Sequence, residues 1–198
     1  MKGILFVLSG PSGTGKGTVC KKLLESECEL FLSVSATTRS CREGEVEGET
    51  YYYVLKEEFE SMIEKGDMLE YTVYNGNYYG TPKKAVEDIL NRGEDVLLEI
   101  EPNGALDVKR IFPEAVLIFL VPPSMAELKN RLLTRGRESV DEIEARIKTA
   151  KWELTQAPQY TTVIENGDLD KCTAEVLGYI NMKRKEKENI QKLINEQV

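Results

Sequence analysis

Residues 3–18 read GILFVLSGPSGTGKGT, an apolar run followed by a glycine-rich turn and a lysine. The run predicts a buried strand over 3–9, and the residues after the turn repeat apolar side chains at helical spacing. A strand, a G-x-x-x-x-G-K turn and a helix together indicate a phosphate loop, because backbone N–H groups and the helix dipole favour anions there. The predicted nucleotide-binding residues are Gly10, Pro11, Ser12, Gly13, Thr14, Gly15, Lys16, Gly17 and Thr18.

Composition restricts the chemistry further. The chain has 198 residues and a net charge of −8, which fits one sizeable domain and argues against a nucleic-acid partner. It has no histidine, and its four cysteines show no C-x-x-C spacing, which argues against a metal site and a Ser-His-Asp triad. Without a membrane-spanning run or a signal-peptide pattern, we expect a cytoplasmic protein with no membrane partner. Homo-oligomerisation stays open.

Further segments predict an α/β organisation. The apolar runs 95–100 and 115–121 suggest strands of a parallel sheet covered by helices on both faces, and 161–166 predicts a fourth strand. Thr81-Pro82 predicts the start of a helix that ends before Gly93, and Ser139 with Glu142 fits a capping box. Residues 34–82 alternate in short, tyrosine-rich pieces and predict a small mixed insertion. Residues 125–150 are rich in charge and predict a helical excursion.

The segment SATTRSCREGEVEGETYYYV (35–54) holds two arginines three positions apart, followed by tyrosines. Guanidinium groups and phenol hydroxyls together suit a phosphate group. In the alternative interpretation, Arg39 and Arg42 lie in a solvated loop and pair with the nearby Glu43, Glu45 or Glu47. Spacing alone leaves both interpretations open.

Four segments in this order resemble guanylate kinases over nearly the whole chain: GPSGTGKGT (10–18), SVSATTRSCREGEVEGETYYYV (33–54), LEYTVYNGNYYGTP (69–82) and PPSMAELKNRLLTRGRES (122–139). The resemblance implies one domain over 1–198, with a P-loop kinase core, a GMP-binding insertion at 34–82 and a lid at 125–150. It also implies transfer of the γ-phosphoryl group of ATP to GMP, giving ADP and GDP, with Mg²⁺.

The resemblance also implies the residues of the GMP site. Glu70 would accept hydrogen bonds from guanine N1–H and the 2-amino group, and Ser35 and Thr81 would donate to guanine O6 or N7. The GMP phosphate would be held by arginines and tyrosines. The full predicted set is Ser35, Arg39, Arg42, Tyr51, Glu70, Tyr79, Thr81 and Glu99. Glu99, which would bind guanine or an active-site water, ranks below Glu70.

For phosphoryl transfer, the resemblance assigns catalytic roles to positive charges. Lys16 would contact the β- and γ-phosphates, and Arg135 and Arg146 would reach the transferring group from the lid. Arg131 is a weaker candidate, and Arg137 occupies a position where the family usually has Thr. The catalytic set is therefore Lys16, Arg39, Arg42, Arg135 and Arg146.

The chain departs from the family pattern in two segments. In EIEPNGAL (99–106), Pro102 and Asn103 replace the family's usual hydrophobic residue and Gln, so a contact made by that amide would be lost or shifted. ENGDLD (165–170) differs from the usual Asn-Asp-Asp run, and we assign it to the adenine pocket.

The phosphate loop itself carries a third unusual feature. Phosphate loops commonly place Ser or Thr after the lysine to bind Mg²⁺, whereas this chain has Gly17 and then Thr18. The G-K-G-T form resembles that of nucleoside monophosphate kinases such as adenylate kinase. We therefore expect Mg²⁺ to be held by ATP phosphates and water, with help from Thr18 or a carboxylate, rather than by a protein metal site.

Two other functions compete with this one. The first is a kinase of the same family with another phosphorylated acceptor, such as a different nucleotide or a sugar phosphate. Glu70, Ser35 and Thr81 favour guanine. The second is a guanylate-kinase-like module that only binds proteins, against which the complete phosphate loop and the arginines argue.

Overall fold

The computed structural model describes residues 1–26, 29–134 and 139–197, and the chain divides into two compact units. Unit 1 comprises Met1–Ser9 and Glu29–Leu117. Unit 2 comprises Gly10–Cys28 and Ile118–Val198. Each unit combines parallel strands with helices, so the α/β prediction is confirmed.

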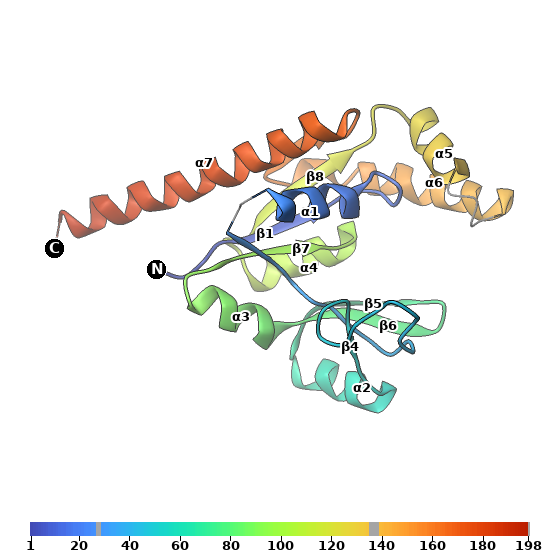
Figure 1. Cartoon of the computed structure of the whole chain (residues 1–198), viewed down its shortest axis with the longest axis horizontal. Coiled ribbons are helices and arrows are strands. Elements are labelled where there is room, and N and C mark those ends of the chain that lie inside the picture. The colour runs from blue at the N-terminus through green and yellow to red at the C-terminus, as the bar shows by residue number, and fades with distance from the viewer. Residues whose placement is uncertain (27–28, 135–138, 198) are drawn as a thin grey trace. The chain divides into compact units, whose positions relative to one another are not determined.

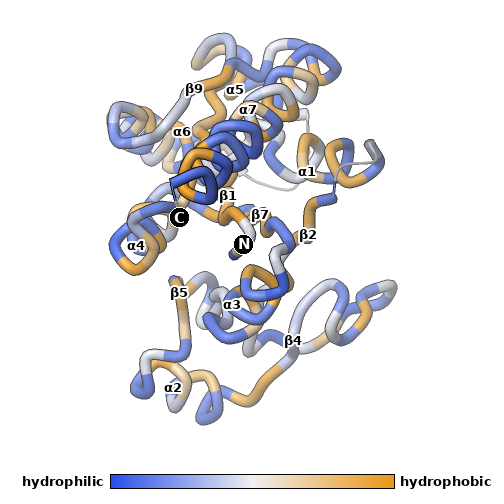
Figure 2. Tube along the Cα trace, turned by 90° about the vertical axis from the view of Figure 1, so that its left-hand side faces the viewer, coloured by the Kyte–Doolittle hydropathy of each residue, from blue (hydrophilic) through white to orange (hydrophobic). Residues whose placement is uncertain are grey.

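One group of strands in unit 1 pairs in parallel. In this unit β7 (Asp95–Glu99) pairs with β1 (Leu5–Ser9) and with β2 (Leu30–Leu32), in registers that include Leu5↔Val96 and Leu30↔Asp95. Every residue of β1 is buried, and Figure 2 shows β1 and β2 as hydrophobic segments. The continuous apolar runs at 3–9 and 95–100 are thus strands, as predicted.

A second, four-stranded sheet of unit 1 has the order β4-β3-β6-β5. Figure 1 labels β4, β5 and β6 of this sheet. Its strands are β3 (Ala36–Thr37), β4 (Tyr52–Tyr53), β5 (Met68–Tyr74) and β6 (Asn77–Pro82). Asn75 and Gly76 join β5 to β6 with positive φ angles of 49° and 75°, as a two-residue hairpin turn requires. Helix α2 (Lys56–Lys65) packs on this sheet through a buried cluster of Ala36, Phe59 and Met68.

Two helices of unit 1 flank its parallel strands. Helix α3 (Lys83–Asn91) contacts β7, and helix α4 (Pro102–Ile111) contacts β1 and β5. The prediction that α3 begins at Thr81 and Pro82 is wrong, because these two residues still pair with β5 as the end of β6. Pro82 is the N-cap instead, and the side chain of Thr81 contacts Glu70.

Unit 2 begins with the phosphate-loop segment and helix α1 (Lys16–Glu25), which contacts the long terminal helix. The strand β8 (Val116–Val121) crosses the boundary between the units and pairs in parallel with β9, as Ile118↔Thr162 shows. Ser139 and Glu142 form the predicted capping box. The remaining elements are α5 (Met125–Thr134), α6 (Val140–Leu154), the 3₁₀ helix η1 (Ala157–Gln159), β9 (Thr162–Glu165) and α7 (Leu169–Asn195).

The terminal helix α7 is the longest element at 27 residues. Neither it nor any other helix in the described ranges combines the length and apolar character that crossing a membrane needs.

Candidate functional site

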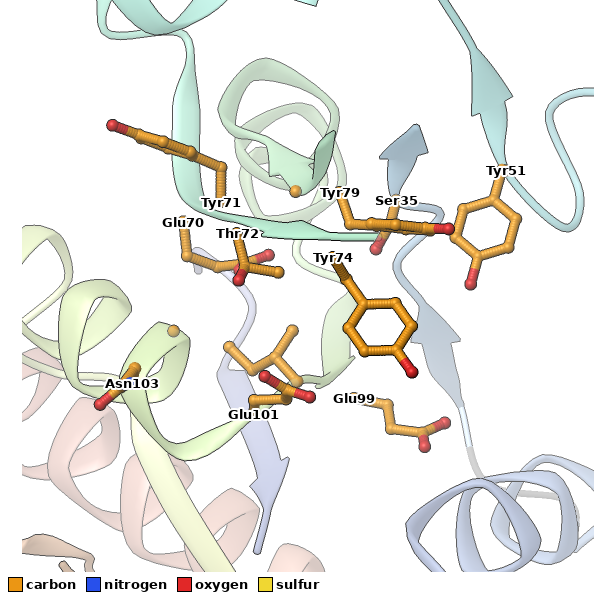
Figure 3. Close-up of a pocket in the computed structure, with 13 residues that line it drawn as sticks. Ser35, Tyr51, Glu70, Tyr71, Thr72, Tyr74, Tyr79, Glu99, Glu101 and Asn103 are labelled. Atoms are coloured by element: carbon orange, nitrogen blue, oxygen red, sulfur yellow. The ribbon is translucent and has the colours of Figure 1, made fainter. Parts of the chain in front are cut away.

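A cavity of about 410 Å³ lies within unit 1 (Figure 3). Its walls come from the second sheet with the residues that precede β3 and β4, and from the segment between the end of β7 and the first turn of α4. Five predicted residues line it, namely Ser35, Tyr51, Glu70, Tyr79 and Glu99. The other lining residues are Tyr71, Thr72, Tyr74, Gly80, Ile100, Glu101, Asn103 and Gly104.

Glu70 is the buried carboxylate of this cavity. It lies on β5 opposite Thr81 of β6, and only 9% of the residue is exposed. The hydroxyl of Thr81 donates to Glu70 Oε1 at 2.7 Å. Burial raises the pKa of Glu70 to about 7, the negative charges of Asp107 and Glu101 add to the rise, and the Thr81 hydrogen bond opposes it. The carboxylate therefore changes charge near neutral pH.

Thr81 thus has a different contact from the predicted one. Its proton is directed to Glu70, and Thr81 is not among the residues that line the cavity. The donation to guanine O6 or N7 stays a prediction for both Thr81 and Ser35, of which Ser35 lines the cavity.

Two tyrosines supply phenol hydroxyls at another side of the cavity. The rings of Tyr51 and Tyr79 meet edge to face with 6.1 Å between their centroids. Burial raises the pKa of Tyr51, so its hydroxyl keeps its proton at neutral pH and can donate to an anion.

Arg39 lies next to these tyrosines and is paired with Glu45. Its Nη1 and Nη2 donate to the two carboxylate oxygens of Glu45 at 2.9 and 2.8 Å, and its guanidinium lies 5.5 Å from the Tyr51 ring centroid. The pair lowers the pKa of Glu45 to about 2 and raises the pKa of Arg39. Glu45 also accepts from the backbone N–H of Arg42 at 2.8 Å. Neither arginine lines the cavity, and for Arg39 the pairing alternative from the sequence describes its contact in this structure.

The phosphate-loop segment of unit 2 has the backbone that its glycines predict. Gly10, Gly13 and Gly15 have φ angles of 142°, 92° and 89°, and Gly15 is the N-cap of α1. At Gly10 a side chain would also meet the backbone oxygen of Leu120, at 2.2 Å from the position of a Cβ. Lys16 Nζ donates to the carbonyl oxygen of Gly10 at 2.6 Å, so its ammonium lies over the loop.

The remaining loop residues stabilise this turn or are exposed at the start of α1. The hydroxyl of Thr14 donates to the carbonyl of Pro11 at 2.8 Å, which closes the turn. Gly17 and Thr18 are exposed in the first turn of α1, so Gly17 places no side chain between the loop and a phosphate.

A second cavity, of about 490 Å³, lies beside the loop within unit 2. Its walls hold Arg131, the weaker sequence candidate, and residues of the 165–170 segment that we assigned to the adenine pocket. Asn166 Nδ2 donates to the carbonyl of Thr14 at 2.7 Å, and Arg131 Nη2 donates to the carbonyl of Asn166 at 2.9 Å. The lining residues are Gly13, Gly15, Thr18, Asn130, Arg131, Thr134, Asn166, Gly167 and Leu169.

One predicted lid arginine contacts the phosphate loop. Arg146 Nη2 donates to the hydroxyl of Ser12 at 3.0 Å, although 134 positions separate the two residues. Arg135 and Arg137 lie outside the described residues.

Pro102 and Asn103, which differ from the family pattern, lie at the start of α4. Pro102 is the first residue of α4, where a backbone N–H has no partner within the helix, so the proline removes no helical hydrogen bond. Asn103 is among the residues that line the cavity of unit 1.

Sequence reasoning missed several cavity residues. Thr72 and Tyr74 alternate with Glu70 along β5, and the two-residue period of a strand could have identified both once Glu70 was selected. Figure 3 shows Glu70 and Thr72 on one side of the strand and Tyr71 leaving on the other. Gly104 carried no such signal, because its place beside Glu70 depends on how α4 packs against β5.

The sequence model of the family described as guanylate kinase matches residues 2–183. A guanylate kinase of Oceanobacillus iheyensis is 51% identical over 191 residues, covering 96% of this chain and 93% of that protein. A guanylate kinase of Thermus thermophilus is 50% identical over 185 residues, covering 93% and 84%. The crystal structure of guanylate kinase from Anaplasma phagocytophilum has a TM-score of 0.73 at 36% identity, covering 92% of this chain and 86% of the other.

Proposed function

The chain belongs to the guanylate kinase family and is an ATP-dependent kinase of GMP, and we propose that the cavity of unit 1 holds GMP and the loop of unit 2 holds the phosphates of ATP. The observation that carries this assignment is Glu70, a buried carboxylate that lines a cavity and is oriented by Thr81.

Glu70 explains a preference for guanine. The Watson–Crick edge of guanine presents two adjacent donors, N1–H and the 2-amino group, which match the two oxygens of an ionised carboxylate. Adenine presents an acceptor at N1 and no 2-amino group, so it would leave the buried charge of Glu70 unpaired. A site built on such a polar pair rejects the wrong base by roughly 10⁴-fold.

The GMP phosphate is bound by Tyr51, Tyr79, Arg39 and Arg42. The two phenols line the cavity, and the raised pKa of Tyr51 keeps its hydroxyl a donor at neutral pH. Glu45 accepts from one edge of the Arg39 guanidinium and from the Arg42 backbone, and it thereby orients the segment that carries both side chains. A guanidinium has five N–H donors, so pairing with a carboxylate leaves donors for a phosphate.

In the transfer step, an oxygen of the GMP phosphate forms a bond to the γ-phosphorus while the bond to the β,γ-bridging oxygen breaks, which releases ADP. The residues contribute by positioning and by neutralising charge. Lys16, placed over the loop, binds the β- and γ-phosphates, and Arg146, next to Ser12, neutralises charge on the γ-phosphoryl group. Residues 125–150 act as the lid and supply Arg135, and residues 34–82 act as the GMP-binding insertion.

The protein side chains near the phosphate loop offer Mg²⁺ few ligands, so the nucleotide must supply most of them. Across the described ranges, no three His, Cys, Asp or Glu side chains gather as ligands of a protein metal site. Thr18 offers an exposed hydroxyl two positions after Lys16. Mg²⁺ prefers phosphate and water oxygens with few protein ligands, so Thr18 would hold it together with ATP. When bound, the metal supplies positive charge to the β- and γ-phosphates.

The test of this function is ADP release in a coupled assay with ATP and GMP, AMP, CMP or UMP as acceptor. GMP should exceed the others in kcat/KM. Faster turnover of another acceptor would favour the alternative of a related kinase, and failure to bind ATP or GMP would favour a protein-binding module.

A further inference from the structure

Gly104 lies against the carboxylate of Glu70, next to Oε2, the oxygen that does not accept from Thr81. A Cβ placed on Gly104 would lie 2.8 Å from Glu70 Oε2, 3.2 Å from Cγ and 3.3 Å from Cδ. Oε1 is the oxygen that accepts from Thr81. The side chain of Glu70 is therefore confined between the Thr81 hydroxyl at one oxygen and the backbone of α4 at the other.

The requirement for glycine here is one of space and not of backbone conformation. Gly104 is the third residue of α4, whose geometry any L-residue adopts, and it is not one of the residues with positive φ. An alanine would even favour the helix, because glycine is the weaker helix former. Since the backbone conformation does not require glycine here, we attribute the glycine to the space that the Glu70 carboxylate needs.

We propose that Gly104 is a positioning residue that determines guanine specificity by leaving room for the Glu70 carboxylate in its base-reading position. This inference rests on the proposed function, because it acts through Glu70. An alanine methyl would meet the end of a flexible side chain, which can rotate away, and the fold would tolerate it. The carboxylate would move, however, and displacements of about 1 Å in a site can cost about 10²-fold in rate.

The mechanism predicts a particular kinetic pattern for Gly104→Ala. The KM for GMP should rise about tenfold or more, while the KM for ATP stays unchanged, because the phosphate loop does not contain the displaced group. Discrimination between GMP and inosine monophosphate, which keeps N1–H but lacks the 2-amino group, should fall. A merely structural defect would change both substrates alike and would lower thermal stability.

A matched control uses the same change in another helix. Gly178 lies in α7, and a Cβ placed there would meet nothing within 4 Å. Gly178→Ala should leave both KM values and the discrimination ratio unchanged. A double variant, Glu70→Asp/Gly104→Ala, tests the same idea. The acidic side chain at position 70 is then one methylene shorter, which leaves room for the methyl group at position 104. The loss in kcat/KM for the double variant should be smaller than the product of the two single losses.

The experiment measures kcat and KM for GMP, ATP and inosine monophosphate in the wild type and these variants, with thermal unfolding as the check of folding. Wild-type kinetics in Gly104→Ala, or losses in the double variant that simply multiply, would overturn the role of Gly104. Glu70→Gln separates the two proposals: if it too behaves as wild type, the assignment of Glu70 to guanine fails, whereas a loss for Glu70→Gln alone refutes only the positioning role.

Discussion

The hydroxyl of Thr81 donates a 2.7 Å hydrogen bond to Oε1 of Glu70, and both residues are buried. The bond joins neighbouring strands of one hairpin, because Glu70 and Thr81 are direct partners in the β5–β6 register. It fixes the direction of a carboxylate that burial would otherwise disfavour in its charged form. Much of the substrate recognition proposed for this kinase depends on this contact.

Replacing Thr81 by valine should weaken GMP binding, because it removes the hydrogen bond that orients Glu70. Valine keeps the shape of threonine but cannot donate, and one lost hydrogen bond to a charged group corresponds to about a tenfold rise in the KM for GMP. Because the Thr81 bond lowers the pKa of Glu70, that pKa should also rise in the variant. Steady-state kinetics over pH would measure both effects. Thr155→Val, at the exposed C-cap of α6 and outside the lid, is the control, and equal kinetics in the two variants would contradict the orienting role.

GMP affinity should depend on pH through Glu70. Only the ionised carboxylate accepts from both guanine donors, and its pKa is about 7. The KM for GMP should therefore be constant above about pH 7 and rise about tenfold per unit below it. The phosphate of GMP titrates near pH 6 and contributes to the same profile. Glu70→Gln retains only that contribution, so identical profiles for wild type and variant would show that Glu70 does not titrate in binding.

The free energy of unfolding of the ligand-free protein should change with pH in the opposite direction to GMP affinity. The pKa of Glu70 is higher in the folded protein than the ordinary 4.5, so the folded state binds the proton more tightly. The contribution of Glu70 to the free energy of unfolding is therefore greatest below about pH 4.5 and is lost as the pH rises through about 7. Glu70→Gln removes this titration and should raise the free energy of unfolding by roughly 3 kcal/mol at pH 8 relative to its effect near pH 4.5. Denaturant unfolding at both pH values measures the difference; a constant difference would contradict it.

Removing the positive charge of the phosphate loop should stop turnover. Lys16→Met keeps the length of the side chain but loses the ammonium group that lies over Gly10. We expect kcat to fall by about 10³-fold or more, because phosphoryl transfer depends on charge neutralisation. The control is Lys21→Met, an exposed lysine of the same helix. Substantial activity in Lys16→Met, with a melting temperature like that of wild type, would exclude this role.

Much of the fold could be predicted from local patterns. The predicted strands at 3–9, 95–100, 115–121 and 161–166 are all present. The first three are apolar runs, as buried parallel strands are, whereas Ile164 is the buried residue of β9. The helix start at Thr81 was wrong for a physical reason: the Thr-Pro pair satisfies the local signal of a helix start, but strand pairing and the bond to Glu70 decide its structure.

The candidate site was predictable only in part. Periodicity cannot distinguish Glu70 from other glutamates, and the family resemblance selected it. Thr72 and Tyr74 then follow from strand alternation. The contact of Gly104 with Glu70 and the bond from Asn166 to Thr14 join residues far apart in the chain, so only the tertiary structure reveals them.

The most direct test of the account is the kinetics of Glu70→Gln. The amide offers one acceptor and places an NH₂ group opposite a guanine donor, so kcat/KM for GMP should fall by about 10²-fold or more while the KM for ATP is unchanged. Glu64→Gln, an exposed glutamate of α2, makes the same chemical change elsewhere in unit 1 and should behave as wild type. If Glu70→Gln kept the wild-type kcat/KM for GMP and the wild-type preference for GMP over AMP, Glu70 would not read the base.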